Sequence, residues 1–475
     1  MGNPICPSLY QINTRVLLTG LSEQTGKRAT LDDIPDDQLD LWKEMGFDWV
    51  WFLSVWSTGE RGRKVSLENP EWRNEFRHTL SNLRDEDIGG SGFAIAGYHV
   101  HPNLGHDEAL ERLRAKLNKR GMKLMLDFVP NHMGPDHPWV SEHPEYFVAG
   151  TEDDILKQPK NYTRVTTGQG QKILAYGRDP YFDGWPDTFQ LDYSNPATVE
   201  AMKGELLRIS TQCDGVRCDM AMLILPEVFK RTWGRSALPF WPIITQAIHE
   251  RTPEFCFMAE VYWDMEWTLQ QQGFNYTYDK RLYDRLREGN ARAVREHFHA
   301  GLDYQNKLAR FLENHDEPRI SDTLNYEQHK AAAMITFCSP GLRFFHQGQF
   351  EGRMLRISPH LVRAPEEPLN TDIQAFYMIL LSVIKTQALR EGTWQLLECV
   401  SAWQGNGSCD DFVAHSWLGK DGERVIIVAN YAPHQSQCYL KLPFQELAGT
   451  QWMFKDMMGE DFYIRDGNNL QAAGL

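Results

Sequence analysis

Short apolar runs alternate with amphipathic, helix-like stretches over most of this chain. Eight of the runs have the length and composition of buried strands: Leu9–Ile12, Trp49–Leu53, Leu124–Phe128, Gly215–Cys218, Phe255–Ala259, Phe274–Tyr278, Ala309–Leu312 and Leu342–Phe345. Helix-like stretches between them include Asp107–Arg120, Pro196–Gln212, Asp279–Ala300 and Glu327–Phe337. Each parallel crossover needs a helix of its own, so this order predicts an α/β protein, a (β/α)8 (TIM) barrel.

Two segments depart from the alternation. Residues 134–190, after the third strand, are rich in Pro, Gly, Asp and aromatic residues and have no clear period. A loop of that length predicts an inserted subdomain. From about Arg390 the pattern changes to period-two runs separated by turn residues, as in Phe412–Leu418 and Arg424–Tyr431. This pattern predicts a C-terminal antiparallel β-domain.

Polar side chains gather where four of the predicted strands end. They are Asp127, Asn131 and His132 at the third strand, Arg217 and Asp219 at the fourth, Glu260 at the fifth, and Asn314, His315 and Asp316 at the seventh. The C-terminal strand ends of a parallel barrel meet at the face that carries active sites, so these groups are candidates for one site. No phosphate-binding glycine loop, nucleophile elbow or Cys/His metal spacing competes with them.

These four segments, DxxxNH, GxRxD, a Glu after an apolar strand and NHD, resemble the motifs of the α-amylase family of glycoside hydrolases and transglycosidases, in the family's order. Tyr10-Gln11-Ile12 is similar to the family's first strand, and Gly97-Tyr98 to its second loop. The resemblance covers the whole barrel. It implies a catalytic domain at 1–133 and 191–389, an inserted B subdomain at 134–190, and a sandwich-like C domain at 390–475.

The resemblance also implies the residue roles. Asp219 matches the nucleophile, Glu260 the acid/base and Asp316 the third carboxylate, which supports the oxocarbenium-like state. On a strand, Arg217 points to the same side as Asp219 and should keep that carboxylate ionised. Burial and neighbouring carboxylates should raise the pKa of Glu260. His132 and His315 match groups that hydrogen-bond the sugar, Tyr98 matches the ring that stacks beneath it, and Asp127 matches a structural residue.

Several positions depart from the family pattern and narrow the range of expected substrates and cofactors. Met222 and Leu223 replace a Lys-His pair that meets the leaving-side sugars in many α-amylases. We therefore expect a retaining α-glucoside hydrolase of short or small-aglycone substrates. Gln190 stands where calcium-dependent members have an acidic group, and Asn131 adds only one neutral oxygen, a poor calcium site. We expect no essential metal and no other cofactor.

Charge and hydropathy limit the partners. With 49 basic and 64 acidic residues the net charge is −15, which argues against nucleic acid and anionic membranes as partners. The longest apolar run, Trp49 to Trp56, is far shorter than the ~20 residues of a membrane span. Eight cysteines without a CxxC pair and no visible secretory signal favour a cytoplasmic location. A small carbohydrate is the expected ligand.

The same residues leave other functions open. A transglycosidase, a disaccharide isomerase and a glycosidic phosphorylase would use the same glycosyl intermediate and differ in what attacks it. A non-catalytic amylase-like binding protein would lose members of the carboxylate triad or carry an anchor, and all three carboxylates are present here. A metal-dependent barrel hydrolase would need ligand pairs on the early strands, where this chain has Gln11-Ile12-Asn13.

Overall fold

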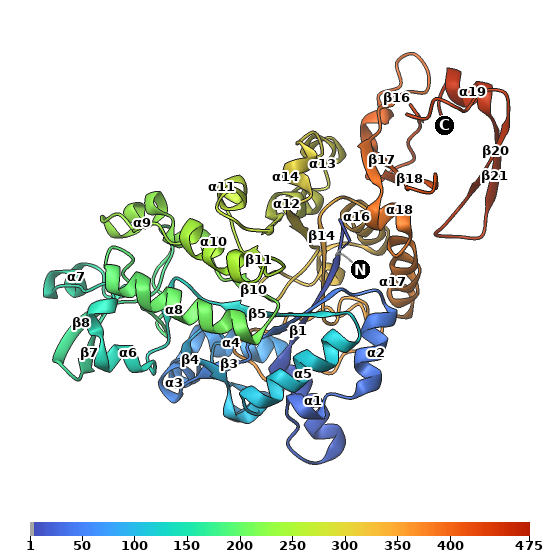
Figure 1. The fold of residues 1–475 in the computed structure, drawn as a ribbon. Coiled ribbons are helices and arrows are strands. Elements are labelled where there is room, and N and C mark those ends of the chain that lie inside the picture. Colours follow the sequence, from blue (N-terminus) through green and yellow to red (C-terminus); the bar gives the residue numbers. More distant parts are fainter. Residues whose placement is uncertain (1–3) are drawn as a thin grey trace.

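The eight apolar runs form a closed barrel of parallel strands in a computed structural model that describes residues 4–475 (Figure 1). Neighbouring barrel strands follow one another in the chain, and the last strand pairs with the first. The barrel strands are β1 (Ser8–Asn13), β2 (Trp49–Leu53), β5 (Lys123–Phe128), β10 (Gly215–Cys218), β11 (Cys256–Ala259), β12 (Tyr276–Tyr278), β13 (Leu308–Arg310) and β14 (Leu342–His346). The predicted fold class is confirmed.

The barrel strands are apolar without alternation because helices cover their outer faces and side chains fill the interior. All five residues of β2 are buried, for example. At Gly215 of β10, a Cβ atom would lie 2.7 Å from the carbonyl oxygen of Cys256 on the neighbouring strand. Only glycine allows that approach.

Helices follow the strands around the outside of the barrel. They are α1 (Thr14–Thr25), α2 (Asp36–Glu44), α3 (Glu60–Glu68), α4 (Pro70–Thr79), α5 (Asp107–Lys119), α8 (Pro196–Gln212), α9 (Pro226–Trp233), α10 (Trp241–Arg251), α11 (Glu266–Gln271), α12 (Lys280–Glu288), α13 (Ala291–His297), α14 (Leu302–Gln305), α15 (Ile320–Thr323), α16 (Tyr326–Phe337), α17 (Thr371–Ile384) and α18 (Gln387–Glu391). The helix predicted at Asp279–Ala300 is two helices. Gly289 ends α12 in a left-handed conformation (φ 72°), and the Asn290 side chain caps α13.

The segment after the third barrel strand carries its own small elements: α6 (Pro138–Glu142), α7 (Glu152–Lys157) and the hairpin β7 (Tyr162–Thr167) and β8 (Gly170–Ala175). Its two ends are joined where β6 (His132–Met133) pairs with β9 (Phe189–Gln190). A barrel strand end and the end of the insertion therefore lie side by side. The domain limits at 134 and 190 stay predictions.

The C-terminal region contains small antiparallel sheets, as predicted. Their strands are β15 (Thr393–Leu396), β16 (Cys399–Ser401), β17 (Phe412–Leu418), β18 (Arg424–Asn430), β19 (Cys438–Leu440), β20 (Gln451–Lys455) and β21 (Phe462–Asp466), followed by α19 (Gly467–Ala472). β17 contacts the barrel through the Trp417 indole, which donates to the carbonyl of Cys338 (2.7 Å). Figure 1 places this region at the opposite end of the molecule from the insertion. Its sandwich-like arrangement stays a prediction.

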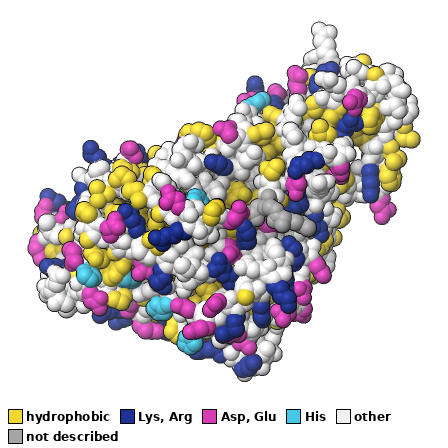
Figure 2. Space-filling model, viewed as in Figure 1, with side chains coloured by type: hydrophobic (Ala, Val, Ile, Leu, Met, Phe, Trp, Pro, Cys, Tyr) yellow, Lys and Arg dark blue, Asp and Glu magenta, His cyan; other side chains and the backbone are white. Residues whose placement is uncertain are grey.

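Charged side chains of both signs are mixed on the surface of the molecule. Figure 2 shows basic and acidic side chains interspersed over one face of the molecule, without a single broad basic area on that face. Between residues 4 and 475, no helix is both long enough and apolar enough to cross a lipid bilayer.

The remaining short strands, β3 (Trp56–Thr58) and β4 (Ile95–Val100), form a two-stranded sheet next to the barrel.

Candidate active site

One buried guanidinium joins two of the predicted carboxylates. Arg217 Nη1 donates to Asp219 Oδ1 (2.7 Å), and Nη2 donates to Glu260 Oε2 (2.7 Å). Arg217 lies on β10 and Asp219 directly follows that strand, while Glu260 follows the neighbouring strand β11. The short ladder between β10 and β11 therefore brings two residues 41 positions apart in the sequence to the same cation.

Aromatic side chains enclose this guanidinium. The rings of Trp51 and Phe93 each lie 5.3 Å from it, and Arg217 Nε donates to the Tyr278 hydroxyl (3.2 Å). Burial opposes the charge, but Glu260, Tyr278 and Asp219 outweigh burial and hold the pKa of Arg217 well above its usual range. Arg217 is therefore a fixed positive charge between the two carboxylates.

The third carboxylate lies at the open side of this cluster. Asp316 Oδ2 is 4.0 Å from Arg217 Nη2, and its side chain is 41% exposed. His315 Nε2 lies 3.1 Å from the same oxygen. The Gln11 amide nitrogen is 2.7 Å from His315 Nδ1, so Nδ1 accepts and the ring proton is on Nε2. Burial holds the pKa of His315 well below its usual range, so the ring is neutral, and its buried Nε2 has no hydrogen-bond partner among the described residues.

Glu260 has different surroundings at its two oxygens. Oε2 accepts from Arg217 and from the backbone N–H of Met220 (2.7 Å), whereas Oε1 accepts from the Tyr262 hydroxyl (2.8 Å). Met220 adopts a left-handed backbone conformation (φ 41°), which is uncommon for a side chain of this kind. Burial raises the pKa of Glu260 to about 8; Asp219 and Asp316 add to this rise, and Arg217 opposes it. Because Oε2 already accepts two donors, Oε1 is the oxygen that can carry a proton.

His132 faces the insertion. It lies at the end of the third barrel strand and is 4% exposed, with its ring centroid 5.2 Å from that of Trp185. Burial lowers its pKa, which keeps the imidazole neutral. The structure thus brings five predicted residues into one cluster at the C-terminal ends of the strands: Asp219, Glu260, Asp316, Arg217 and His315. His132 lies near this cluster, because the charge of Asp219 acts on its imidazole.

Tyr98 does not lie where the sequence comparison with the family places it. It is 1% exposed, its ring packs between Trp56 and Phe128, and its hydroxyl donates to the carbonyl of Val129 and accepts from the N–H of Val129. No ring face is left for a sugar, so Tyr98 is corrected to a core residue. Phe93 is the ring beside the site instead, because it stacks on His315 with centroids 5.4 Å apart.

Two further carboxylates are structural. Asp127 accepts from the Trp51 indole (3.1 Å) and from the backbone N–H of Ser54 (2.9 Å). Glu313 was not singled out in the sequence; it accepts from Arg319 (2.6 Å) and from the N–H of Ile320 (2.8 Å). Both sets of bonds hold the loops at the strand ends. A Glu directly before the NHD segment was the only available signal for Glu313.

The calcium position implied by the family resemblance contains an amide group here. Gln190 Nε2 donates to three oxygens: the Asn131 carbonyl (2.9 Å), Asn131 Oδ1 (3.0 Å) and the Leu191 carbonyl (3.1 Å). These oxygens would face a cation if the amide did not lie between them. Calcium needs six to eight oxygen ligands, usually with carboxylates among them, so the residues present do not fit it. Within residues 4–475, no cluster of three His, Cys, Asp or Glu side chains could hold a metal ion.

Comparison with known proteins decides the family. Residues 30–359 match the family described as "Alpha amylase, catalytic domain". The chain belongs to the α-amylase family. This match spans the second to eighth barrel strands and all four motifs that suggested the family from the sequence.

Family relatives include transferases and hydrolases. The chain is 27% identical over 264 residues to an α-1,4-glucan:maltose-1-phosphate maltosyltransferase of Burkholderia pseudomallei, covering 54% of this chain and 20% of that protein. It is 23% identical over 318 residues to α-amylase 3 of Dictyoglomus thermophilum, covering 61% and 60%. The chain thus spans less than two thirds of either relative. A maltogenic α-amylase structure from Thermotoga neapolitana has a TM-score of 0.67 at 19% identity, covering 96% and 93%.

Proposed function

We propose that this α-amylase-family protein is a retaining α-glycoside hydrolase that acts on α-glucosides with a short or small leaving group. The observation that carries the proposal is the buried Arg217 bridge between Asp219 and Glu260, with Asp316 at its open side. One guanidinium can reach both carboxylates only when they lie close together. Closely spaced carboxylates, about 5–5.5 Å apart, are typical of retaining glycosidases.

In the first step, Asp219 attacks the anomeric carbon of the glucoside. The bond from that carbon to the leaving oxygen breaks, and Glu260 gives its proton to that oxygen. A pKa of about 8 keeps Glu260 protonated at neutral pH until the leaving oxygen develops charge. The ester between Asp219 and the sugar is the product of this step.

In the second step, Glu260 acts as the base. It takes a proton from water, the water oxygen bonds to the anomeric carbon, and the ester bond to Asp219 breaks. In this proposal Asp316 and the neutral His315 hold sugar hydroxyls, and Phe93 provides an apolar ring beside them. Interactions that strengthen at the oxocarbenium-like state lower the barrier of both steps.

The preference for a small leaving group rests on Met222 and Leu223. Both are buried, at 0% and 3% exposure, in the turn Ala221–Ile224 that follows the nucleophile. Neither can offer a polar group to a long leaving-side glucan chain. Starch-type endo-hydrolysis therefore fits this site less well than cleavage of a short substrate.

Replacement of each carboxylate separates the three roles. Asp219→Ala should lower turnover by a factor of about 10⁴ or more, because the ester cannot form. Glu260→Ala should fail with alkyl glucosides but still form the ester from p-nitrophenyl α-glucoside, whose leaving group needs little protonation. Azide attacks without a base, so it should restore turnover of this variant and give the α-glucosyl azide.

Asp316→Ala is the matched comparison. It should slow every substrate and gain nothing from azide, because its contacts act at the transition state. NMR analysis of the products, together with rates for alkyl and p-nitrophenyl glucosides, distinguishes the three variants. Rescue of Asp219→Ala by azide with the α-product, or the same response in all three variants, contradicts the assignment.

Transfer is a second candidate, favoured by the maltosyltransferase name of the Burkholderia pseudomallei relative. Here a sugar hydroxyl replaces water in the second step and the residues keep the same roles. Incubation with maltose, p-nitrophenyl α-glucoside and maltose 1-phosphate, with and without a glucan acceptor, separates the two. Release of free sugar at the rate of donor consumption supports hydrolysis, and chain extension of the acceptor supports transfer.

A further inference from the structure

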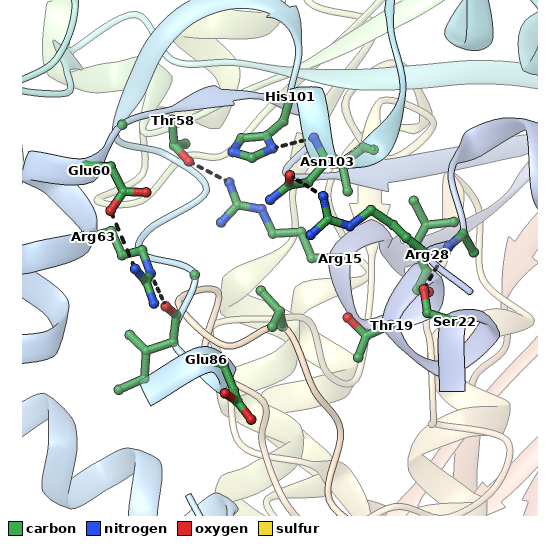
Figure 3. Close-up of a pocket in the computed structure, with 17 residues that line it drawn as sticks. Arg15, Thr19, Ser22, Arg28, Thr58, Glu60, Arg63, Glu86, His101 and Asn103 are labelled. Atoms are coloured by element: carbon green, nitrogen blue, oxygen red, sulfur yellow. Dashed lines mark hydrogen bonds and ion pairs between the residues drawn. The ribbon is translucent and has the colours of Figure 1, made fainter. Parts of the chain in front are cut away.

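A cavity of about 370 Å³ lies apart from the residues of the candidate active site. Its walls come from α1, from β3 and the start of α3, from residues 86–89, and from residues 101–104. None of the seven residues predicted for the carbohydrate site lines it. Figure 3 shows the labelled side chains arranged around an open centre. Its volume is within the range of small-molecule binding sites.

A buried arginine without an acidic partner reaches into this cavity. Arg15 is 6% exposed and donates only to neutral oxygens, the Gly90 carbonyl (2.8 Å) and the Thr58 hydroxyl (3.0 Å). Across residues 4–475, no carboxylate forms an ion pair with it, and burial lowers its pKa to about 10. Buried charges are normally paired, so this guanidinium lacks the anionic partner that is expected for a buried cation.

Other donors surround the same space. Arg28 donates to Asn103 Oδ1 (2.9 Å) and Arg63 donates to the Ile88 carbonyl (2.8 Å). His101 Nδ1 accepts from the N–H of Asn103, so the proton of the neutral ring is on Nε2. Burial, Arg15 and Arg28 hold the pKa of His101 at about 4. Burial is the larger cause, and the positive charges of Arg15 and Arg28 that add to it would also attract an anion in the cavity.

The acidic residues of the cavity are at its rim. Glu60 is 87% exposed and lies 3.4 Å from Arg63, while Glu86 is 69% exposed and pairs with Arg84 outside the cavity (2.8 Å). Their charges are screened by solvent, whereas that of Arg15 is not. The interior of the cavity is therefore cationic in a protein whose net charge is −15.

We propose that this cavity is a binding site for a small organic phosphate, with Arg15 as its central contact and Arg28, Arg63 and His101 around it. Donors on separate sides suit a tetrahedral phosphate, which presents oxygens in several directions, better than a planar carboxylate. The volume leaves room for a group the size of a monosaccharide beyond the phosphate. Leu18, Ala29 and Leu104 supply an apolar wall for it.

The test is calorimetric binding of glucose 1-phosphate, glucose 6-phosphate and inorganic phosphate to the full chain. The Asp219→Asn variant is used throughout, so that turnover does not contribute. We expect saturable binding that Arg15→Met abolishes and that Arg28→Gln weakens by about tenfold or more. Lys27→Gln makes the same charge change beside Arg28 but does not line the cavity, and it should leave the affinity within about twofold.

Arg28 is exposed and donates one hydrogen bond between side chains, so Arg28→Gln should fold even if Arg15→Met does not. Three results overturn the proposal: no saturable binding of any of the three phosphates, equal affinity in Arg28→Gln and Lys27→Gln, or a dicarboxylate such as malonate bound as tightly as glucose 1-phosphate. Tighter binding of a sugar phosphate than of inorganic phosphate identifies the phosphorylated sugar as the better ligand.

Discussion

Glu260 has three charged neighbours and one hydroxyl, and these determine the pH at which it can act as an acid. Loss of its proton at about pH 8 should reduce kcat/KM for an alkyl glucoside as the pH rises through that value. Tyr262 stabilises the ionised form by donating to Oε1. In Tyr262→Phe the pKa of Glu260 should rise further, so the alkaline limb should move up by about half to one pH unit, as expected for a hydrogen bond of about 1 kcal/mol.

The pH profile of kcat/KM from pH 5 to 10 measures this shift. Tyr283→Phe removes a hydroxyl on α12 that does not bond to Glu260, and it should leave the limb unchanged. A limb that falls near the ordinary pKa of a glutamic acid, or one that moves down in Tyr262→Phe, would contradict the proposed role of Glu260.

Phe93 and Tyr98 are five residues apart and should behave in opposite ways. Phe93→Ala removes the half-buried ring beside His315 and should lower kcat/KM by about tenfold, the equivalent of ~1.4 kcal/mol, with little loss of stability. Tyr98→Phe leaves the backbone groups of Val129 without their partner and should cost about 1–3 kcal/mol of unfolding free energy with KM unchanged. Steady-state kinetics and urea unfolding distinguish the two. A larger rise of KM in Tyr98→Phe than in Phe93→Ala would show that the Tyr98 hydroxyl, and not the Phe93 ring, contacts the sugar.

At the scale of elements, the two-stranded pairing of β6 with β9 ties the insertion to the barrel. The Gln190 amide lies at this junction and satisfies three oxygens of the connecting segments. The two segments are adjacent only in the folded chain, because Met133 and Gln190 are 57 positions apart in the sequence. The Gln190 amide can therefore satisfy the oxygens of the connecting segments, as a cation does in calcium-dependent members of the family.

Substitutions at Gln190 test this. Gln190→Leu removes the donor and should lower Tm by a few degrees, because buried acceptors lose their partner. Gln190→Glu should also lower Tm, but calcium should restore it, since the new carboxylate faces the same oxygens. Differential scanning calorimetry with calcium or with a chelator is the measurement. The wild-type protein is expected to respond to neither, and a wild-type Tm that falls with chelator would show a metal site elsewhere.

For the whole molecule, buried carboxyl groups and buried histidines change the stability with pH in opposite directions. Burial raises the pKa of Asp127 and of Asp187 to about 7, and that of Glu260 to about 8. A group with a raised folded pKa contributes full stability below its unfolded value of about 4, and this contribution is lost as the pH rises through the folded value. Glu313 acts in the opposite sense: Arg319 and His346 overcome its burial and lower its pKa to about 2, so its contribution is lost only in acid.

Below about pH 6.5 the buried histidines, whose pKa values are lowered by burial, contribute more stability as the pH rises and oppose this effect. Tm should therefore fall between about pH 6.5 and pH 8. Asp187 is buried and has an unpaired side-chain oxygen, so Asp187→Asn should flatten this fall without touching the candidate active site. Asp183→Asn, at an exposed position that pairs with Lys160, is the control and should leave the slope unchanged. Thermal unfolding at intervals of half a pH unit measures both slopes. A Tm that rises steadily to pH 8 would contradict the direction of these shifts.

The sequence alone determined the barrel and most of the carboxylate site. Buried parallel strands leave continuous apolar runs, and the polar residues that end these runs must lie at one face, so Asp219, Glu260 and Asp316 could be placed together before their geometry was known. The two-residue period of a strand was enough to predict that Arg217 faces Asp219. These features depend on local backbone geometry, which neighbouring residues encode.

Only the tertiary structure decided which ring lies beside the site, what fills the calcium position and where an unpaired buried charge remains. Tyr98 and Phe93 lie in the same segment between the second and third barrel strands. Contacts with Trp56, Phe128 and His315 determine which of the two rings is enclosed. The three bonds of Gln190 and the missing partner of Arg15 depend likewise on segments far apart in the sequence. Side-chain packing and hydrogen-bond satisfaction depend on residues far apart in the sequence, so a local sequence pattern cannot predict them.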